Sequence, residues 1–157
     1  MKQGLGNEGR AQRFPMDNDS AIYGYFTKKI SSNESSLGTT HMLLRETDHL
    51  LLRFGEMMLI RKDPSTECRM ILREAADEIW FLIDGNVEFI WHDLRQDSPT
   101  FDQVHKLMCD QPTLVLAPFG VAFGCHALEN PASLIRIATY EEGSHPGDRS
   151  FVWEVKA

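Results

Sequence analysis

Short apolar segments recur along this chain from residue 56 onward, and no segment with helical periodicity interrupts them. They are spaced by roughly 8 to 12 residues, which is typical of β-sandwiches and barrels. Many antiparallel strands without crossover helices predict an all-β jelly-roll barrel, because closure of the sheet removes most open edges. The segments are Met57–Ile60, Cys68–Leu72, Ile79–Ile83, Val87–Trp91, Thr113–Leu116, Leu134–Ala138 and Phe151–Val155.

Turn residues separate these segments. Asp84-Gly85 lies between two of them and is a preferred dipeptide of the two-residue type I′ hairpin, in which both central residues need a positive φ. We therefore expect Ile79–Ile83 to pair antiparallel with Val87–Trp91. Further turns are indicated at Pro64-Ser65, Ser98-Pro99, Gly120, Asn130-Pro131 and Pro146-Gly147.

The N-terminal part of the chain has a weaker pattern. Residues 1–20 are rich in Gly, Asn, Arg and Asp, and we expect a disordered tail or an arm swapped onto a partner subunit. Residues 22–30 predict a first strand, and residues 31–40 an exposed loop. Residues 41–54 fit two short strands joined by a turn, or a short helix. Residues 21–157 are interpreted as one domain, since 157 residues suffice for a single core.

Composition limits the classes of function. Of the 157 residues, 42% are hydrophobic and 25% charged, and no apolar run of about 18 residues exists that would cross a membrane. The polar start of the chain lacks the apolar core of a signal peptide, which predicts a cytoplasmic protein. A net charge of −7 argues against a nucleic-acid surface. Cys68, Cys109 and Cys125 have no C-x-x-C spacing, so we expect buried free thiols.

Three segments taken in order resemble a known family. They are Glu78–Gly85, the stretch Asp93-Leu94-Arg95…Ser98-Pro99-Thr100-Phe101, and Pro118-x-Gly120 followed by Ala122 and Gly124. Over residues 54–153 the chain resembles the cupins, and among them the dTDP-4-dehydrorhamnose 3,5-epimerase group. The resemblance implies a jelly-roll subunit, a homodimer and a nucleotide-sugar pocket in the barrel. It also implies that Asp93 and Arg95 are structural residues that fix a strand end and the following turn.

The resemblance does not extend to the metal ligands of cupins. Metal-binding cupins use two His and a Glu on one hairpin and a later His, which suit borderline transition metals. Glu78 matches the Glu position, whereas the His positions are Leu72, Glu74 and Phe123. One matching ligand of four predicts no metal and no other cofactor.

The catalytic residues of the epimerases are also replaced. Their metal-free chemistry uses a His base, held by an Asp, and a Tyr acid. The resemblance places the base at Leu72 and its supporting Asp near Val155, while Tyr140 is a possible match for the acid. The sequence therefore predicts that epimerisation by this mechanism has been lost.

Several polar residues remain candidates for a site. Arg69 matches an Arg near the nucleotide pyrophosphate, although a surface strand charge explains it equally well. Alternation points Arg73 and Arg136 into the barrel, where they either bind a ligand or pair with Glu74 and Glu78. The candidate ligand-binding residues are thus Arg69, Arg73, Glu74 and Arg136, and the candidate acid–base residues are Tyr140, His126 and Glu78.

These observations favour an epimerase-like cupin that binds a nucleotide sugar or another small polar ligand. Two alternatives stay open. One is a divergent carbohydrate isomerase or epimerase with a different acid–base set. The other is a non-catalytic structural or regulatory module whose barrel is plugged by bulky residues such as Phe123 and Leu72.

Overall fold

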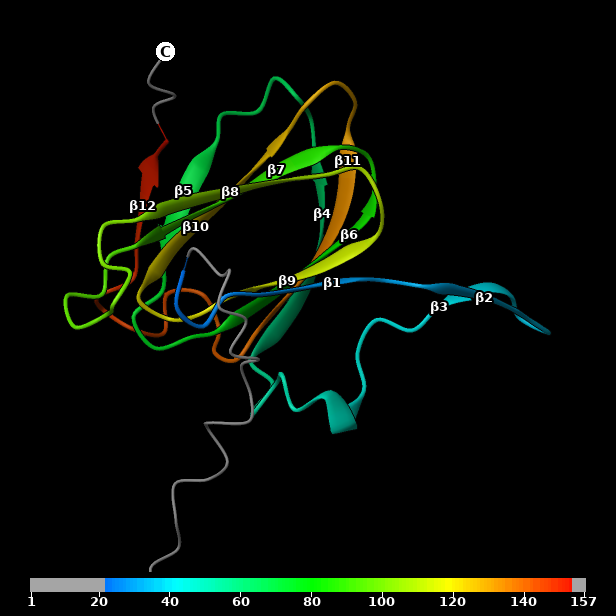
Figure 1. The fold of residues 1–157 in the computed structure, drawn as a ribbon, viewed down its shortest axis with the longest axis horizontal. Coiled ribbons are helices and arrows are strands. Elements are labelled where there is room, and N and C mark those ends of the chain that lie inside the picture. The colour runs from blue at the N-terminus through cyan, green and yellow to red at the C-terminus, as the bar shows by residue number, and fades with distance from the viewer. Residues whose placement is uncertain (1–21, 154–157) are drawn as a thin grey trace, which may run out of the picture.

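The computed structural model describes residues 22–153, which form two five-stranded antiparallel sheets packed face to face (Figure 1). The predicted arm at residues 1–20 and the residues around Val155 lie outside this range. In spatial order the first sheet contains β1 (Phe26–Lys29), β9 (Thr113–Ala117), β6 (Glu78–Asp84), β11 (Ala132–Ala138) and β4 (Glu56–Lys62). The second contains β12 (Arg149–Val152), β5 (Arg69–Leu72), β10 (Val121–Ala127), β7 (Val87–Asp93) and β8 (Val104–Cys109). The prediction of an all-β, cupin-type jelly roll is confirmed.

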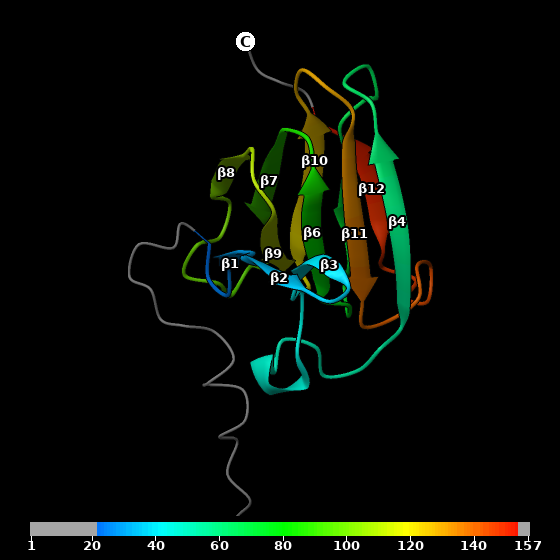
Figure 2. The same cartoon turned by 90° about the vertical axis from the view of Figure 1, so that its right-hand side faces the viewer.

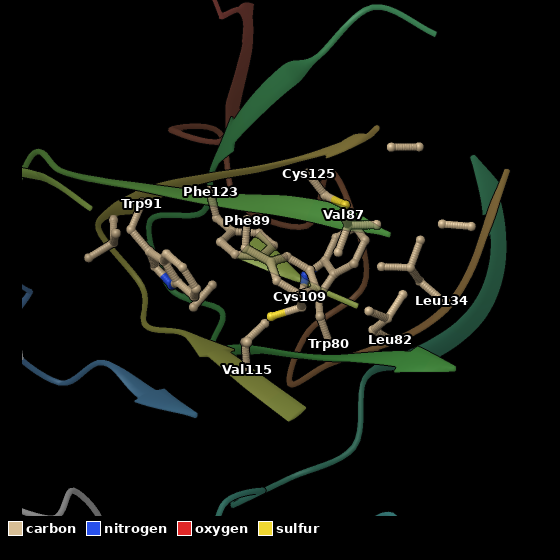
Figure 3. Packing of buried hydrophobic residues seen from close by; sticks show 14 of the residues in the cluster. Trp80, Leu82, Val87, Phe89, Trp91, Cys109, Val115, Phe123, Cys125 and Leu134 are labelled. Atoms are coloured by element: carbon tan, nitrogen blue, oxygen red, sulfur yellow. The ribbon is translucent and has the colours of Figure 1, made fainter. Parts of the chain in front are cut away.

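Aromatic side chains fill the space between the two sheets. Figure 3 shows Trp80 of β6 facing Phe89 of β7 and Phe123 of β10 across this interior. The Phe123 ring centroid lies 5.3 Å from that of Trp80, 5.7 Å from that of Phe89 and 5.2 Å from that of Trp91. Such aromatic contacts add to the free energy gained by burying the rings. Phe123 therefore occupies the middle of the barrel as a core residue.

A long connection covers the outer face of the first sheet. Leu43, Leu44, Leu50 and Leu51 pack against apolar side chains of β6 and β9. Within this connection the chain forms a single 3-10 turn, η1 (Glu46–Asp48), so the two-strand alternative is wrong and the short helix is present only as this one turn. No helix among residues 22–153 is long and apolar enough to cross a membrane.

The predicted hairpin at Asp84-Gly85 is wrong. β6 pairs with β9 and β11 in the first sheet, whereas β7 pairs with β8 and β10 in the second. Gly85 has a φ of 99°, but Asp84, the other central residue of the predicted turn, does not share the positive φ that a type I′ turn requires. A Cβ atom at Gly85 would lie 2.8 Å from the Cα atom of Ala132, so glycine is needed for close packing where the chain crosses between sheets.

The sequence also misplaced strands near the N-terminus and in the second sheet. Residues 31–40 form a projecting hairpin, β2 (Ser32–Ser35) and β3 (Gly38–His41), instead of the predicted loop (Figures 1 and 2). The first strand is limited to β1, which is shorter than predicted. β8 and β10 were missed, because β8 alternates with polar residues and β10 contains Gly and Ala. Both are therefore poor in the β-branched residues that mark strands.

A fully buried carboxylate organises the turn after β7. Asp93 accepts hydrogen bonds from the backbone and guanidinium of Arg95, and its Oδ2 atom lies 2.6 Å from the hydroxyls of both Ser98 and Thr100. Arg95 also donates to the carbonyl of Tyr23, and the Tyr23 amide donates to Thr100. Burial raises the pKa of Asp93, but the bonds from Arg95, Ser98 and Thr100 lower it by more, to well below its usual range.

We expect Asp93→Asn to lower the free energy of unfolding at neutral pH by about 2 to 3 kcal/mol, since the charge-assisted bonds are lost. A depressed carboxyl pKa stabilises the fold above the unfolded pKa of about 4, and this contribution disappears as the pH falls below it. The difference between wild type and variant should therefore shrink under acidic conditions. Urea unfolding across the pH range measures it, with exposed Asp97→Asn as the control. A difference of similar size at acidic and neutral pH would contradict this account.

Candidate functional site

A cluster of buried charges lies at the end of the barrel where β6 begins. Glu78 Oε1 accepts hydrogen bonds from Arg73 Nη1 at 2.9 Å and from Arg136 Nη1 at 3.1 Å. Glu78 Oε2 accepts one from the Trp80 indole at 2.9 Å. The three charged residues are at most 3% exposed. Strand alternation brings Glu78 of β6 and Arg136 of β11 inward, while Arg73 lies in the loop directly after β5. We call these three residues, with Glu56 and Asp148, the ion cluster.

The outer members of the ion cluster, Glu56 and Asp148, give each arginine a second carboxylate partner. Arg73 Nε donates to Asp148 at 3.1 Å, and Arg73 Nη2 donates to the carbonyls of Tyr140 and Glu141. Arg136 Nη2 donates to Glu56, while its buried Nε atom has no partner among the described residues. Buried charges require such pairing because of their desolvation cost. The sequence allowed Arg73 and Arg136 either to bind a ligand or to pair with Glu74 and Glu78. In the structure both arginines pair with Glu78, and neither pairs with Glu74.

A polar hollow of about 330 Å³ lies next to the ion cluster. It is formed where β5 and β7 end and where β10 and β12 begin, on the outer side of the second sheet. We call it the rim hollow, and its lining residues are Leu72, Glu74, Leu94, Arg95, Gln96, Gly120 and Arg149.

Backbone contacts tie the rim hollow to the ion cluster. Asp148 bonds Arg73 with one carboxylate oxygen and accepts from the amide of Glu74, at 2.9 Å, with the other. The Gly120 amide donates to the Arg73 carbonyl at 2.7 Å. Gly120 has a φ of 78°, and a Cβ atom there would lie 2.5 Å from Cγ of Arg95. The position therefore requires glycine, which leaves room for the Arg95 side chain.

Two guanidinium groups line the rim hollow. Arg149 is exposed and forms no ion pair with another described residue, while Arg95 is held by Asp93 at 2.8 Å. Glu74 supplies an exposed carboxylate and Gln96 an amide. Guanidinium groups suit phosphate, and carboxylate and amide groups suit hydroxyls. The hollow thus has the polar groups that a phosphorylated sugar requires.

The structure distributes the predicted ligand-binding residues over different places. Glu74 lines the rim hollow, whereas Arg73 and Arg136 are buried in the ion cluster. Arg69 is exposed on β5, where it donates to Ser150 at 3.0 Å and lies 3.6 Å from Glu67. Sequence reasoning did not single out Gln96 or Arg149 and treated Arg95 as structural. Of these residues, only Arg95 lies in a motif that the sequence makes recognisable. Arg149 becomes a candidate only through the pairing of β12 with β5, which the sequence does not show.

The predicted acid–base residues do not meet. Glu78 is enclosed in the ion cluster, and the guanidinium carbon of Arg53 lies 3.9 Å from the ring centroid of Tyr140. His126 pairs with Glu88 near the far end of β10, about 17 Å along the strand from the end where Glu78 lies. Tyr140, His126 and Glu78 therefore do not form one catalytic group in this structure.

Leu72 does not point into the barrel, as the predicted plug would require. It pairs with Ala122 and packs with Met70 and Ile90 on the outer face of the second sheet. Phe123, one residue after Ala122, points to the interior. Because successive strand residues face opposite sides, Leu72 does not fill the barrel with Phe123.

The cysteines are free, as predicted, but only Cys109 and Cys125 are buried, whereas Cys68 is half-buried. Burial raises the pKa of Cys125 to about 12 and also raises that of Cys68, so both thiols stay protonated. Among residues 22–153, no three His, Cys, Asp or Glu side chains are grouped as a metal site. The expectation that no metal or cofactor binds stays a prediction.

Comparison with solved structures places this fold in a known class. A dTDP sugar isomerase from Desulfovibrio desulfuricans superposes with a TM-score of 0.69 at 17% identity, covering 87% of this chain and 88% of that one. A dTDP-4-dehydrorhamnose 3,5-epimerase from Bacillus anthracis superposes with a TM-score of 0.71 at 18% identity, covering 84% and 81%. The chain therefore has the cupin fold of the dTDP-sugar epimerases.

A relative is also found at the level of sequence. The spore coat polysaccharide biosynthesis protein SpsL of Bacillus subtilis is 29% identical over 137 residues, which cover 85% of this chain and 91% of that protein. No family model matches the chain. The recognised resemblance to the epimerase group is confirmed at the level of the fold.

We expect Glu78→Ala to lower the free energy of unfolding by about 3 to 5 kcal/mol, because it leaves two buried guanidinium groups without their shared carboxylate. Glu74→Ala is the matched control, since the Glu74 side chain is exposed, and it should cost at most about 0.5 kcal/mol. Chemical denaturation of both variants measures the difference. Equal stabilities would show that the ion cluster contributes little to folding.

Proposed function

We propose that this protein binds a nucleotide sugar, or a ligand of similar chemistry, in the rim hollow and acts in carbohydrate biosynthesis. The observation that carries the proposal is the convergence of Arg95 and Arg149 with Glu74 on one polar hollow. The guanidinium groups bind the diphosphate, and Glu74 and Gln96 accept and donate hydrogen bonds to sugar hydroxyls.

The compared proteins support this class of ligand. The Bacillus anthracis epimerase was solved with TDP and PPi bound, and SpsL is described as a polysaccharide biosynthesis protein. A shared fold alone does not define a function, so the proposal depends on the polar groups of the rim hollow.

The protein performs no His-dependent epimerisation under this proposal. The position expected for the His base holds Leu72, and the later His position of the cupins holds Phe123; both side chains pack in apolar clusters. Glu78 has hydrogen-bond partners on both carboxylate oxygens, so it has no free position from which to accept a substrate proton.

A divergent isomerase is the second candidate function. The observation that favours it is the position of Glu74, whose carboxylate is exposed and lines the rim hollow. A carboxylate within reach of a bound keto sugar serves as a general base. The third alternative, a plugged non-catalytic module, is supported by the packing of Phe123 and requires that no ligand binds.

The homodimeric state and cytoplasmic location predicted from the sequence also belong to this proposal. Both accord with a subunit that handles small nucleotide-linked sugars.

The binding proposal predicts that thymidine diphosphate raises the melting temperature of the protein, since a ligand of the native state stabilises it by mass action. Arg149→Ala should weaken binding by about tenfold or more, because a charged hydrogen bond to phosphate is lost. Isothermal titration calorimetry measures both affinities. Arg69→Ala is the matched control on the neighbouring strand and should bind as the wild type does. Equal weakening by both variants, or no binding at all, would refute a site at the rim hollow.

Incubation with dTDP-4-keto-6-deoxyglucose in D₂O distinguishes binding from isomerisation. We expect no deuterium at the sugar carbons, because no imidazole lines the rim hollow. Proton and mass spectra of the recovered sugar give the answer. Exchange that disappears in Glu74→Gln would establish the isomerase alternative and overturn the proposal of a binding protein.

A further inference from the structure

Tyr23 is an exposed aromatic residue next to one of the guanidinium groups of the rim hollow. The guanidinium carbon of Arg95, which lines the hollow, lies 5.8 Å from the centroid of the Tyr23 ring. This distance is near the outer limit of about 6 Å for a cation–π contact, and Tyr23 remains 55% exposed. Arg95 therefore leaves the ring open to a flat group of a ligand, which can stack on it.

Backbone hydrogen bonds hold Tyr23 in place. Its amide donates to the Thr100 hydroxyl at 2.9 Å, and its carbonyl accepts from Arg95 Nη2 at 2.6 Å. Both partners are bonded to the buried carboxylate of Asp93, and Ile22, directly before Tyr23, is fully buried in the core. The ring is thus attached to a fixed backbone, so a ligand that stacks on it orders few additional torsions.

Arg95 keeps hydrogen-bond donors for a ligand while it holds Tyr23. Its Nε and Nη2 atoms make the bonds to Asp93 and to the Tyr23 carbonyl, whereas Nη1 donates to no other described residue. Guanidinium donors of this kind bind phosphate oxygens. In a nucleotide a single ribose separates the first phosphate from the base. A phosphate bound at Arg95 therefore places the base within reach of the Tyr23 ring.

We propose that Tyr23 is a stacking platform for the base of a nucleotide-linked ligand, so that the rim hollow prefers nucleoside diphosphates to a diphosphate without a base. The inference rests on the proposed function, because it needs the phosphate groups to bind at Arg95 and Arg149. Stacking uses the π face that every base has and reads no particular base. Tyr23 thus selects a nucleotide as ligand without restricting it to thymidine.

Calorimetric titration with three ligands tests the platform. They are thymidine diphosphate, adenosine diphosphate and methyl diphosphate, which is the same diphosphate monoester without a base. Both nucleotides should bind the wild type about tenfold or more tightly than methyl diphosphate, as expected for one stacked base. Tyr23→Ala should abolish this preference and leave the affinity for methyl diphosphate unchanged, because the backbone bonds to Arg95 remain.

Two further variants control this comparison. Tyr23→Phe retains the ring and should retain the preference for nucleotides. Phe101→Ala removes an aromatic residue of similar exposure, 49%, from the turn after β7, and it should bind all three ligands as the wild type does. Nuclear Overhauser contacts between the Tyr23 ring and the base protons of thymidine diphosphate give a measurement on the unaltered chain, and their absence would contradict stacking.

The outcomes separate this inference from the proposed function. Equal binding of all three ligands by the wild type would overturn the platform and leave the phosphate site standing. Equal weakening of all three in Tyr23→Ala would also overturn it, since Tyr23 would then act only through Arg95. If the wild type binds none of them, the site at the rim hollow is refuted, and the platform fails with it.

Discussion

This end of the barrel depends on the two ion pairs of Glu78. Its carboxylate is shared between the guanidinium groups of Arg73 and Arg136. It joins the loop after β5, which continues to Glu74 of the rim hollow, to β6 and β11 of the first sheet. Removing any partner leaves a buried charge without one of its counter-charges, whereas in the complete set every charged group is paired with one of opposite sign. Glu78 was predicted as an acid–base candidate, and this pairing, together with the Trp80 indole, occupies both of its carboxylate oxygens.

The sequence predicted the architecture well where the signal was local and periodic. Alternating apolar runs gave the strands around Trp80, Phe89 and Leu134 and the all-β class. Strand pairing was predicted poorly, because Asp84-Gly85 carries the dipeptide of a hairpin but serves a crossover whose close contact with Ala132 is set by tertiary packing. β10 escaped notice because small residues such as Gly124 fit beneath Met70 of the neighbouring strand, and small residues give little β-strand signal.

The candidate site was only partly accessible to sequence reasoning. Arg73, Glu78 and Arg136 were recognised as inward charges, yet alternation alone does not say whether such charges bind a ligand or one another. Arg149 follows a loop and has no motif around it, so only its pairing with Leu72 brings it to the rim hollow. Residues that act together from distant strands are defined by register, which composition and spacing do not encode.

The two carboxylate oxygens of Asp148 bind different partners, one in the buried cluster and one in the backbone of Glu74. This bridge ties the backbone at Glu74, in the wall of the rim hollow, to the buried guanidinium group of Arg73. A ligand that enters there pays little conformational entropy for ordering that wall, and the cost falls mainly on the exposed side chain of Arg149. Preorganisation of this kind favours recognition of a rigid phosphate group over adaptation to many ligands.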